Sequence, residues 1–226
     1  AKKKKIGSDM DITKARRNVI EQQVRPWGGL NVRANQALSD VPRENFVPEN
    51  FQGLVFADIE IPLSSSAKMF SPKIEGRILD SVDVKSDESV LEIGTGSGYF
   101  TAVLSKLADS VVSIEIDQAL SASATENLKS LNVNNVDLQV SDASTTDFSN
   151  QKYDVIVLGC SLNEQSKKLN ELLNTGGRLF AVIGSKNKMR ATLITRISEN
   201  EWRTKSIFET HLDYMKGQEP TAVFAF

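Results

Sequence analysis

The stretch VLEIGTGSGYF, residues 90–100, decides the fold of this chain. A short apolar run leads to an acid, passes through three closely spaced glycines and continues into a segment with apolar residues at helical spacing. This order predicts a strand, a tight turn and the start of a helix, a geometry that brings backbone N–H groups against a ligand. We therefore interpret residues 94–98 as a ligand-binding loop; the alternative is an ordinary strand-to-helix turn.

From residue 89 onward, short apolar segments alternate with helical ones. Strands are expected at 90–93, 111–116, 136–140, 153–158 and 177–183, and helices near 98–108, 118–131 and 164–174. Short apolar strands joined by crossover helices predict an α/β fold with a doubly wound, mostly parallel, Rossmann-like sheet. After residue 188 the segments 192–197, 203–209 and 221–226 resemble strands joined by short turns, so the sheet is expected to end antiparallel.

The part of the chain before residue 86 has a different pattern. Helices are expected near 13–25, 32–39 and 72–82, with an irregular segment rich in proline and phenylalanine between the second and the third. We divide the chain into a basic, disordered tail (1–12), an N-terminal helical cap that contributes to the acceptor site (13–85) and a ligand-binding domain (86–226).

Composition narrows the classes of function. The chain has 226 residues, an apolar fraction of 40 % and a net charge of −2, which fit one large globular domain and argue against binding nucleic acid by bulk electrostatics. A single cysteine and a single histidine allow no intrachain disulfide and make a zinc site an unlikely design, so no metal is expected. The chain has no apolar run long enough to span a membrane and no secretory signal, so we expect a cytoplasmic protein.

The glycine spacing favours S-adenosyl-L-methionine over NAD as the ligand. The loop reads G-x-G-x-G, whereas a dinucleotide fingerprint has its third glycine where this chain has Tyr99. Glu115 ends the second expected strand 21 residues after Gly94, where an acid can accept hydrogen bonds from both ribose hydroxyls. Asp142 ends the third strand, where it can accept a hydrogen bond from an adenine amino group. Parallel sheets bind ligands at these strand ends.

Each of these acids also has a purely structural interpretation. Glu115 is alternatively a surface carboxylate that caps the next helix, although Asp117 suits that role better because it directly precedes the helix. Asp142 is alternatively a turn residue bonded to its own backbone. Glu92 either pairs with the ammonium group of the methionine end or only braces the glycine loop.

The residues expected to bind the cofactor come from the glycine loop and from the ends of four strands: Glu92, Gly94, Thr95, Gly96, Ser97, Gly98, Glu115, Ile116, Asp142, Ala143 and Leu158.

Two segments point to a known family. LEIGTGSGY, residues 91–99, resembles the first motif of the protein-L-isoaspartate O-methyltransferases. VPRENFVP, residues 41–48, followed by Ala57-Asp58 and Ile61-Pro62, is similar to the region that precedes this motif in that family. The resemblance covers about residues 13–184. It implies a protein-repair enzyme with a methyltransferase fold that methylates isoaspartyl residues of proteins or peptides with S-adenosyl-L-methionine.

Two positions depart from the family pattern. The family has a serine, one intervening residue and a proline over the reacting centre, whereas this chain has Ser71 directly before Pro72. Ser71 is the expected catalytic residue by resemblance, and it is equally suited to be a helix N-cap with Pro72 at the first helical position. The family also tends to have Thr-Ala-Ala after its fourth strand, where this chain has Leu158-Gly159-Cys160. These departures leave the cofactor inference intact and weaken the inference about the acceptor.

The chemistry that the resemblance implies needs few catalytic side chains. An acceptor carboxylate is already ionised near neutral pH, so methyl transfer requires alignment and exclusion of water rather than a general base. Cys160 is expected to be a small buried hydrophobe and His211 a structural residue. The alternatives are a methyltransferase for another small-molecule or protein acceptor, and a protein that binds S-adenosyl-L-methionine without turnover. An NAD-dependent oxidoreductase is disfavoured by Tyr99.

Overall fold

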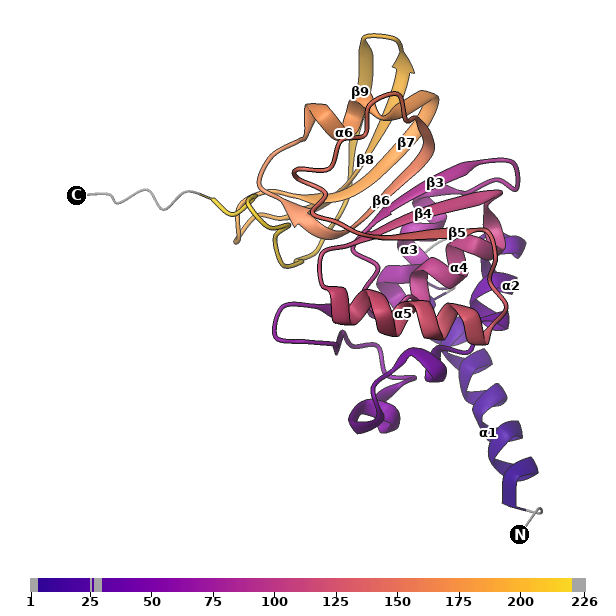
Figure 1. Cartoon of the computed structure of the whole chain (residues 1–226). Helices are drawn as coiled ribbons and strands as arrows, with labels where there is room; N and C mark the ends of the chain where they lie inside the picture. Colours follow the sequence, from indigo (N-terminus) through magenta and orange to yellow (C-terminus); the bar gives the residue numbers. More distant parts are fainter. Residues whose placement is uncertain (1–3, 25, 27–29, 221–226) are drawn as a thin grey trace.

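The computed structural model describes residues 4–24, 26 and 30–220. Its centre is a seven-stranded sheet in the order β5-β4-β3-β6-β7-β8-β9 (Figure 1). The bounds of the strands are β3 Ser89–Ile93, β4 Ser110–Glu115, β5 Val136–Val140, β6 Tyr153–Leu162, β7 Leu173–Ile183, β8 Arg190–Ser198 and β9 Glu201–Glu209. The first five of these are mutually parallel, and β8 and β9 add antiparallel pairings. The predicted doubly wound sheet with an antiparallel C-terminal end is confirmed.

The helices cover the sheet unequally. Their bounds are α1 Lys4–Val19, α2 Val32–Asp40, α3 Pro72–Val82, α4 Tyr99–Leu107, α5 Gln118–Ser130 and α6 Lys167–Glu171, with a π-helical turn at Ile20–Val24 and 3₁₀ turns at Arg43–Phe46 and Glu49–Leu54. Helices α2 to α5 lie on one face of the sheet and the short α6 lies on the other (Figure 1). No helix in the described part of the chain is long and apolar enough to cross a membrane.

Alternation along the strands divides the core into two layers. Val155, Val157 and Phe180 pack in the layer beneath α2–α4, while Ile156 and Leu158 pack in the layer covered by α6. Successive side chains of a strand point to opposite faces, so strands buried on both faces read as continuous apolar runs. This is the physical basis of the strand predictions from sequence.

Local signals also set the helix starts. Asn31 caps α2 by accepting a hydrogen bond from the Ala34 N–H at 2.7 Å. Asp117 caps α5 by accepting from the N–H groups of Ala119 and Leu120, as the sequence predicts. These contacts satisfy backbone donors that have no partner within the first helical turn.

Three expectations differ from the structure or fall outside the described residues. Helix α1 begins at Lys4, within the segment expected to be a disordered tail, and the division of the chain at residue 12 stays a prediction. The helix expected at 164–174 is only five residues long, because Leu173 already pairs with Tyr153 in the sheet. The strand expected at 221–226 lies outside the described residues.

The strand order creates a crevice at the end of two central strands. From β3 the chain winds outward through β4 to β5, then returns to β6 on the other side of β3. The connections that leave β3 and β6 therefore diverge, and doubly wound sheets bind ligands at such a switch point. In front of it lies a small hairpin formed by β1 (Ile61–Pro62) and β2 (Lys68–Met69).

Candidate functional site

The glycine loop follows β3 and faces the crevice. Gly94, Gly96 and Gly98 have φ values of +96°, +56° and +81°, in the region that side chains rarely adopt. The Gly96 N–H donates to Glu115 Oε2 at 2.8 Å, so the loop is joined to the end of β4. Every second residue of the loop adopts the left-handed conformation, which glycine favours. This explains why the three glycines are spaced two residues apart in the sequence.

A large pocket opens between the strand ends and the β1–β2 hairpin. Its empty volume is about 960 Å³, part of it open to solvent. One side, here called the sheet wall, consists of lining residues from the ends of β3, β4, β5 and β6: Ile93, Gly94, Gly96, Ile114, Glu115, Ile116, Ser141, Asp142, Ala143, Gly159 and Cys160. The other side, the loop wall, comes from residues 66–70 and 211–216. Most of the expected cofactor residues therefore lie together on the sheet wall.

Glu115 is held in place before any ligand binds. It is 5 % exposed, and its second oxygen, Oε1, accepts the Asp117 N–H at 3.0 Å. Each carboxylate oxygen has two lone pairs, so both can still accept a hydroxyl proton from the pocket. The helix-capping alternative for Glu115 does not apply, because Asp117 makes the cap. The neighbouring Ile116 side chain is 48 % exposed and offers an apolar surface to the same pocket.

Asp142 has the geometry of a turn residue and also an oxygen that faces the pocket, so its contacts agree with both interpretations made from the sequence. Its Oδ1 accepts from the Ser144 N–H at 3.0 Å and from the Ser144 hydroxyl at 2.6 Å, which is the turn geometry. The Ser144 hydroxyl contact lowers the pKa of Asp142, so it is ionised at neutral pH. Its Oδ2 lies 3.5 Å from the Lys216 ammonium at the pocket. One oxygen therefore shapes the loop, and the other remains on the ligand side.

Glu92 lies beneath the glycine loop in a hydroxyl network. Its Oε2 accepts from Thr101 at 2.5 Å and from Ser113 at 2.6 Å, and the Thr95 hydroxyl lies 2.6 Å from that of Ser113. Glu92 is 2 % exposed, and its burial raises its pKa to about 7. Through these contacts Glu92 supports the glycine loop, which is the second of its two interpretations. Glu92 also borders a smaller, second pocket. Sequence patterns do not identify Ser113 and Thr101 as its partners, because these residues lie on other elements.

Gly159 is a site residue that sequence reasoning did not select. It lies in β6 opposite the start of the glycine loop, and a Cβ there would be 2.9 Å from the Gly94 carbonyl oxygen and 3.3 Å from that of Ile93. No side chain fits at that distance without moving the loop. The preceding residue, Leu158, is fully buried in the core and lines neither of these two pockets, although we expected it to contact the cofactor.

The loop expected to cover the acceptor, residues 68–72, is here called the acceptor loop, and the side chains that it presents to the pockets do not include the expected Ser71. Lys68, Met69 and Phe70 line both pockets, whereas Ser71 lines neither and is 8 % exposed. Ser71 is the N-cap residue of α3 by position, but its side chain makes no capping hydrogen bond. Phe70 instead packs edge-to-face on Phe100, with ring centroids 5.7 Å apart.

A buried arginine holds this loop. Arg43 donates to the Phe70 carbonyl at 2.7 Å and to the Val55 carbonyl at 3.2 Å, and it forms an ion pair with Glu75. The Arg43 and Glu75 side chains are 4 % and 2 % exposed. Arg43 belongs to the VPRENFVP segment, so this segment fixes the backbone of the acceptor loop.

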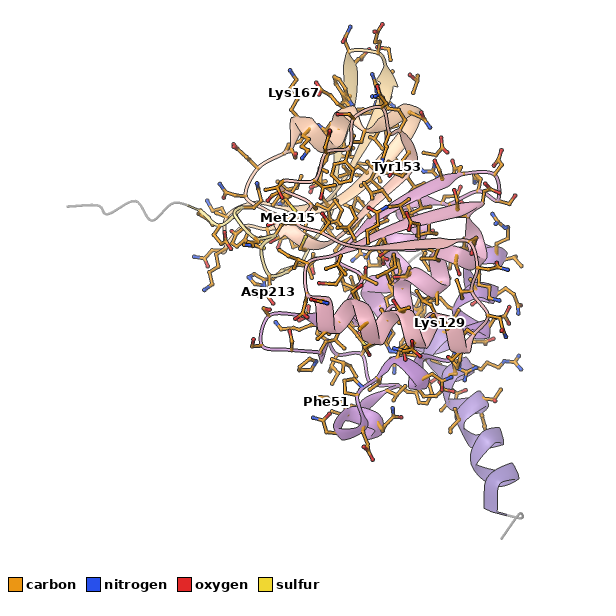
Figure 2. The ribbon with its side chains drawn as sticks, viewed as in Figure 1. Phe51, Lys129, Tyr153, Lys167, Asp213 and Met215 are labelled. Atoms are coloured by element: carbon orange, nitrogen blue, oxygen red, sulfur yellow. The ribbon has the colours of Figure 1, made fainter. Side chains whose placement is uncertain are left out.

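The C-terminal part of the loop wall was not anticipated from the sequence. Ser161 in β6 donates its N–H to the Asp213 carbonyl and its hydroxyl to the Leu212 carbonyl, and it accepts the Met215 N–H. These bonds hold residues 211–216 against the pocket, and Figure 2 labels Asp213 and Met215 in this segment. His211 lines the pocket, and the structural role expected for it stays a prediction.

Cys160 lies half-buried on the sheet wall, and burial raises the pKa of its thiol to about 12. It is therefore a neutral thiol at physiological pH and not an activated nucleophile. Within the described residues no group of three or more histidine, cysteine, aspartate or glutamate side chains could hold a metal ion.

Comparisons with known proteins agree on one family. The family model "Protein-L-isoaspartate(D-aspartate) O-methyltransferase (PCMT)" matches residues 16–214. A protein-L-isoaspartate O-methyltransferase of Syntrophus aciditrophicus (strain SB) is 34 % identical over 187 residues, which are 83 % of this chain and 86 % of that protein. Protein-L-isoaspartate O-methyltransferase 2 of Marinobacter nauticus is 31 % identical over 210 residues, 92 % of this chain and 96 % of that protein.

A solved structure supports the same fold. A Plasmodium falciparum protein, described as a protein-L-isoaspartate O-methyltransferase in complex with S-adenosyl-L-homocysteine, superposes with a TM-score of 0.76. It is 18 % identical, and the match covers 89 % of this chain and 98 % of that one.

Proposed function

The chain belongs to the protein-L-isoaspartate(D-aspartate) O-methyltransferase family, and we propose that it transfers a methyl group from S-adenosyl-L-methionine to the carboxylate of isoaspartyl residues in proteins or peptides. The observation that carries this proposal is the pocket between the glycine loop, Glu115 and Asp142 on one side and the acceptor loop on the other.

The sheet wall fits S-adenosyl-L-methionine. Glu115 would accept hydrogen bonds from the ribose hydroxyls, and Asp142 would accept a hydrogen bond from the adenine amino group. Ile116 and Ala143 supply apolar surface beside them, and the backbone of residues 94–98 leaves room for the methionyl part. Glu92, with both carboxylate contacts going to Ser113 and Thr101, supports the glycine loop from below.

When bound, S-adenosyl-L-methionine supplies a methyl group whose C–S bond breaks, with its electron pair passing to sulfur, as the acceptor oxygen forms the new C–O bond. The chain itself provides alignment. Both pockets are bordered by Met69, Phe70 and Gly159. In this proposal the cofactor and the acceptor meet at these residues. Their apolar surface excludes water and keeps the acceptor oxygen poorly solvated, which favours attack on carbon.

This arrangement needs no general base. An isoaspartyl carboxylate is ionised at neutral pH, and Cys160 holds a neutral thiol. The expected catalytic contact of Ser71 stays a prediction, and the pocket favours a role for Phe70 in shaping the acceptor site instead. The expected cytoplasmic location and the absence of a nucleic-acid partner also stay predictions.

The test uses radiolabelled S-adenosyl-L-methionine and two peptides that differ only in one aspartate or isoaspartate. Labelled methyl ester on the isoaspartyl peptide alone supports the proposal. The variant Glu115→Ala serves as a control that removes the ribose contact and should lower the signal at limiting cofactor. Equal labelling of both peptides would contradict the selectivity for isoaspartate.

Two lining residues favour a second candidate function, in which the protein does not methylate isoaspartyl peptides. Phe70 and Cys160 line the pocket where the family pattern has a hydroxyl and a smaller side chain. A methyltransferase for a different small-molecule or protein acceptor, or a binding protein without turnover, would show the same cofactor affinity in calorimetry but no ester on the isoaspartyl peptide.

A further inference from the structure

Lys68 lies where the two pockets adjoin. It is in strand β2 of the small hairpin and lines both the large pocket and the second pocket. The residues shared by the two pockets are Lys68, Met69, Phe70, Gly94, Gly96 and Gly159. Among these six residues Lys68 alone has an ionisable side chain, so it places a charge at the boundary of the two pockets.

The surroundings of Lys68 are strongly acidic. Glu60, Glu115, Asp142 and Asp213 line the large pocket. A carboxylate acceptor that enters this site approaches like charges, which disfavour its binding. The other lysine that lines the large pocket, Lys216, lies 3.5 Å from Asp142 and so belongs to the adenine end. Lys68 is the lining lysine placed to offset this repulsion at the acceptor end.

The present partners of Lys68 are easily exchanged. Its ammonium group lies 3.2 Å from Asp213 and 3.7 Å from Glu60, with side-chain exposures of 43 %, 54 % and 39 % respectively. Ion pairs this exposed contribute little to stability because water solvates both partners. The contact with Asp213 raises the pKa of Lys68, so the ammonium is charged at neutral pH.

We propose that Lys68 binds the acceptor carboxylate, releasing Asp213 as it does so. The proposal rests on the proposed function, since it deepens the description of the acceptor site. In the free protein Asp213 and Glu60 hold the ammonium across the mouth of the pocket; in the complex the acceptor carboxylate takes their place. Methylation turns that carboxylate into a neutral ester, which loses the attraction to Lys68 and so leaves the site.

This role predicts a particular kinetic signature. The carboxylate is fully charged when it binds and loses charge as the C–O bond forms, so Lys68 stabilises the bound acceptor more than the transition state. Removing the charge should therefore raise KM for the peptide while kcat stays constant or rises.

The experiment compares Lys68→Met and Lys68→Arg with Lys129→Met, which removes an equal charge from the outer surface of α5 (Figure 2). Methylation of an isoaspartyl peptide is measured against peptide concentration at saturating cofactor. For Lys68→Met we expect KM to rise about tenfold, and for Lys68→Arg less than about threefold, because a charged contact is kept. The affinity for S-adenosyl-L-homocysteine should stay within about twofold in all three variants.

A second measurement keeps the test independent of turnover. The isoaspartyl peptide and its carboxamide analogue are titrated by calorimetry in the presence of S-adenosyl-L-homocysteine. Wild type should prefer the carboxylate over the amide, and Lys68→Met should lose most of that preference.

The variant Asp213→Asn distinguishes exchange from simple repulsion. If Asp213 competes for Lys68, Asp213→Asn tightens binding of the carboxylate peptide in wild type and has no such effect in the Lys68→Met background. Equal tightening in both backgrounds shows that Asp213 only repels the acceptor and overturns the exchange.

The outcomes separate the two proposals. Absence of methyl transfer by wild type contradicts the proposed function, while the calorimetric preference still reports on Lys68. Unchanged KM and unchanged carboxylate preference in Lys68→Met overturn the role of Lys68 and leave the methyltransferase intact. Failure of wild type to bind the carboxylate peptide contradicts both.

Discussion

The sheet wall and the loop wall enclose the same pocket but are built in different ways. On the sheet wall, Glu115 is 5 % exposed and is fixed by the N–H groups of Gly96 and Asp117. On the loop wall, Lys68 and Asp213 are about half exposed and meet through an ion pair between two segments far apart in the chain. Buried hydrogen bonds from backbone N–H groups to a carboxylate are strong because water is excluded from them. An exposed ion pair is weak, because water solvates both charges, and its partners can exchange. The sheet wall is therefore held rigidly, whereas the contacts on the loop wall can exchange.

The largest effect is expected from Gly159→Val, which would break the sheet wall. The new side chain would start 2.9 Å from the Gly94 carbonyl oxygen, so the glycine loop must move away from β6. We expect affinity for S-adenosyl-L-homocysteine to fall about 100-fold and stability by about 3 kcal/mol, on the scale of an overpacked core. Calorimetry and urea unfolding measure the two effects. Gly53→Ala is the matched control, because nothing lies within 4 Å of a Cβ there; equal effects of both variants would refute the close-approach argument.

Removal of one anchored acid should have the next largest effect. Glu115→Ala deletes the acceptor for two backbone N–H groups and for the ribose, and we expect cofactor binding to weaken by about 1.5–3 kcal/mol. The strands should survive, which circular dichroism checks. Glu126→Ala, at an exposed position on α5, is the control. A folded Glu115→Ala protein with wild-type affinity would mean that Glu115 does not contact the ribose.

The buried acid beneath the sheet wall should show itself through pH. Burial raises the pKa of Glu92 from 4.5 to about 7, so the folded state binds its proton more tightly than the unfolded state. Stability is therefore fully present below about pH 4.5 and falls as the pH rises through 7. Glu92→Gln cannot titrate, and between pH 5 and pH 8 it should lose on the order of 2 kcal/mol less stability than wild type.

Urea unfolding of the ligand-free protein at both pH values measures this difference. Titratable groups elsewhere affect wild type and Glu92→Gln alike and cancel in the comparison. Parallel pH profiles of the two proteins would show that Glu92 is ionised in the folded state.

The smallest effect on stability and turnover is expected from substitution of Ser71, which directly follows residues 66–70 of the loop wall. Its side chain makes no capping bond and lines neither pocket, so Ser71→Ala should change stability by less than about 0.5 kcal/mol and turnover by less than about threefold. Asn31→Ala, at the cap of α2 where the side chain accepts the Ala34 N–H and donates to Asp83, should cost about 1 kcal/mol or more. A large loss of turnover in Ser71→Ala with unchanged cofactor affinity would restore the catalytic role expected from the family pattern.

Much of the sheet wall is readable in the sequence because its signals are local. The glycine spacing at 94–98 requires left-handed backbone, Glu115 ends a largely buried strand, and Asp142 follows the partly exposed strand β5. The order of the parallel strands then brings their ends to one edge. Leu158 is buried in the core and lines neither pocket, because neighbouring residues of a strand face opposite sides; its contact with the cofactor stays a prediction.

The loop wall could not be read in the same way. A hydroxyl beside a proline singles out Ser71 in the sequence, but the Arg43 contact to the Phe70 carbonyl sets the backbone so that residues 68–70 line the pocket. Residues 211–216 carry no motif, and their place depends on hydrogen bonds to Ser161, some 50 residues earlier. Nothing in either segment alone indicates that the two approach each other.

The order of strands and helices, the glycine loop and the acids at the strand ends are predictable from the sequence, because each depends on backbone conformation and burial over a few residues. Three contacts depend on the packing of separate elements: Gly159 lies against Gly94, Ser113 and Thr101 donate to Glu92, and Lys68 pairs with Asp213 on the loop wall. These contacts join residues from separate elements, and their distances follow from how whole elements pack, which no local pattern encodes.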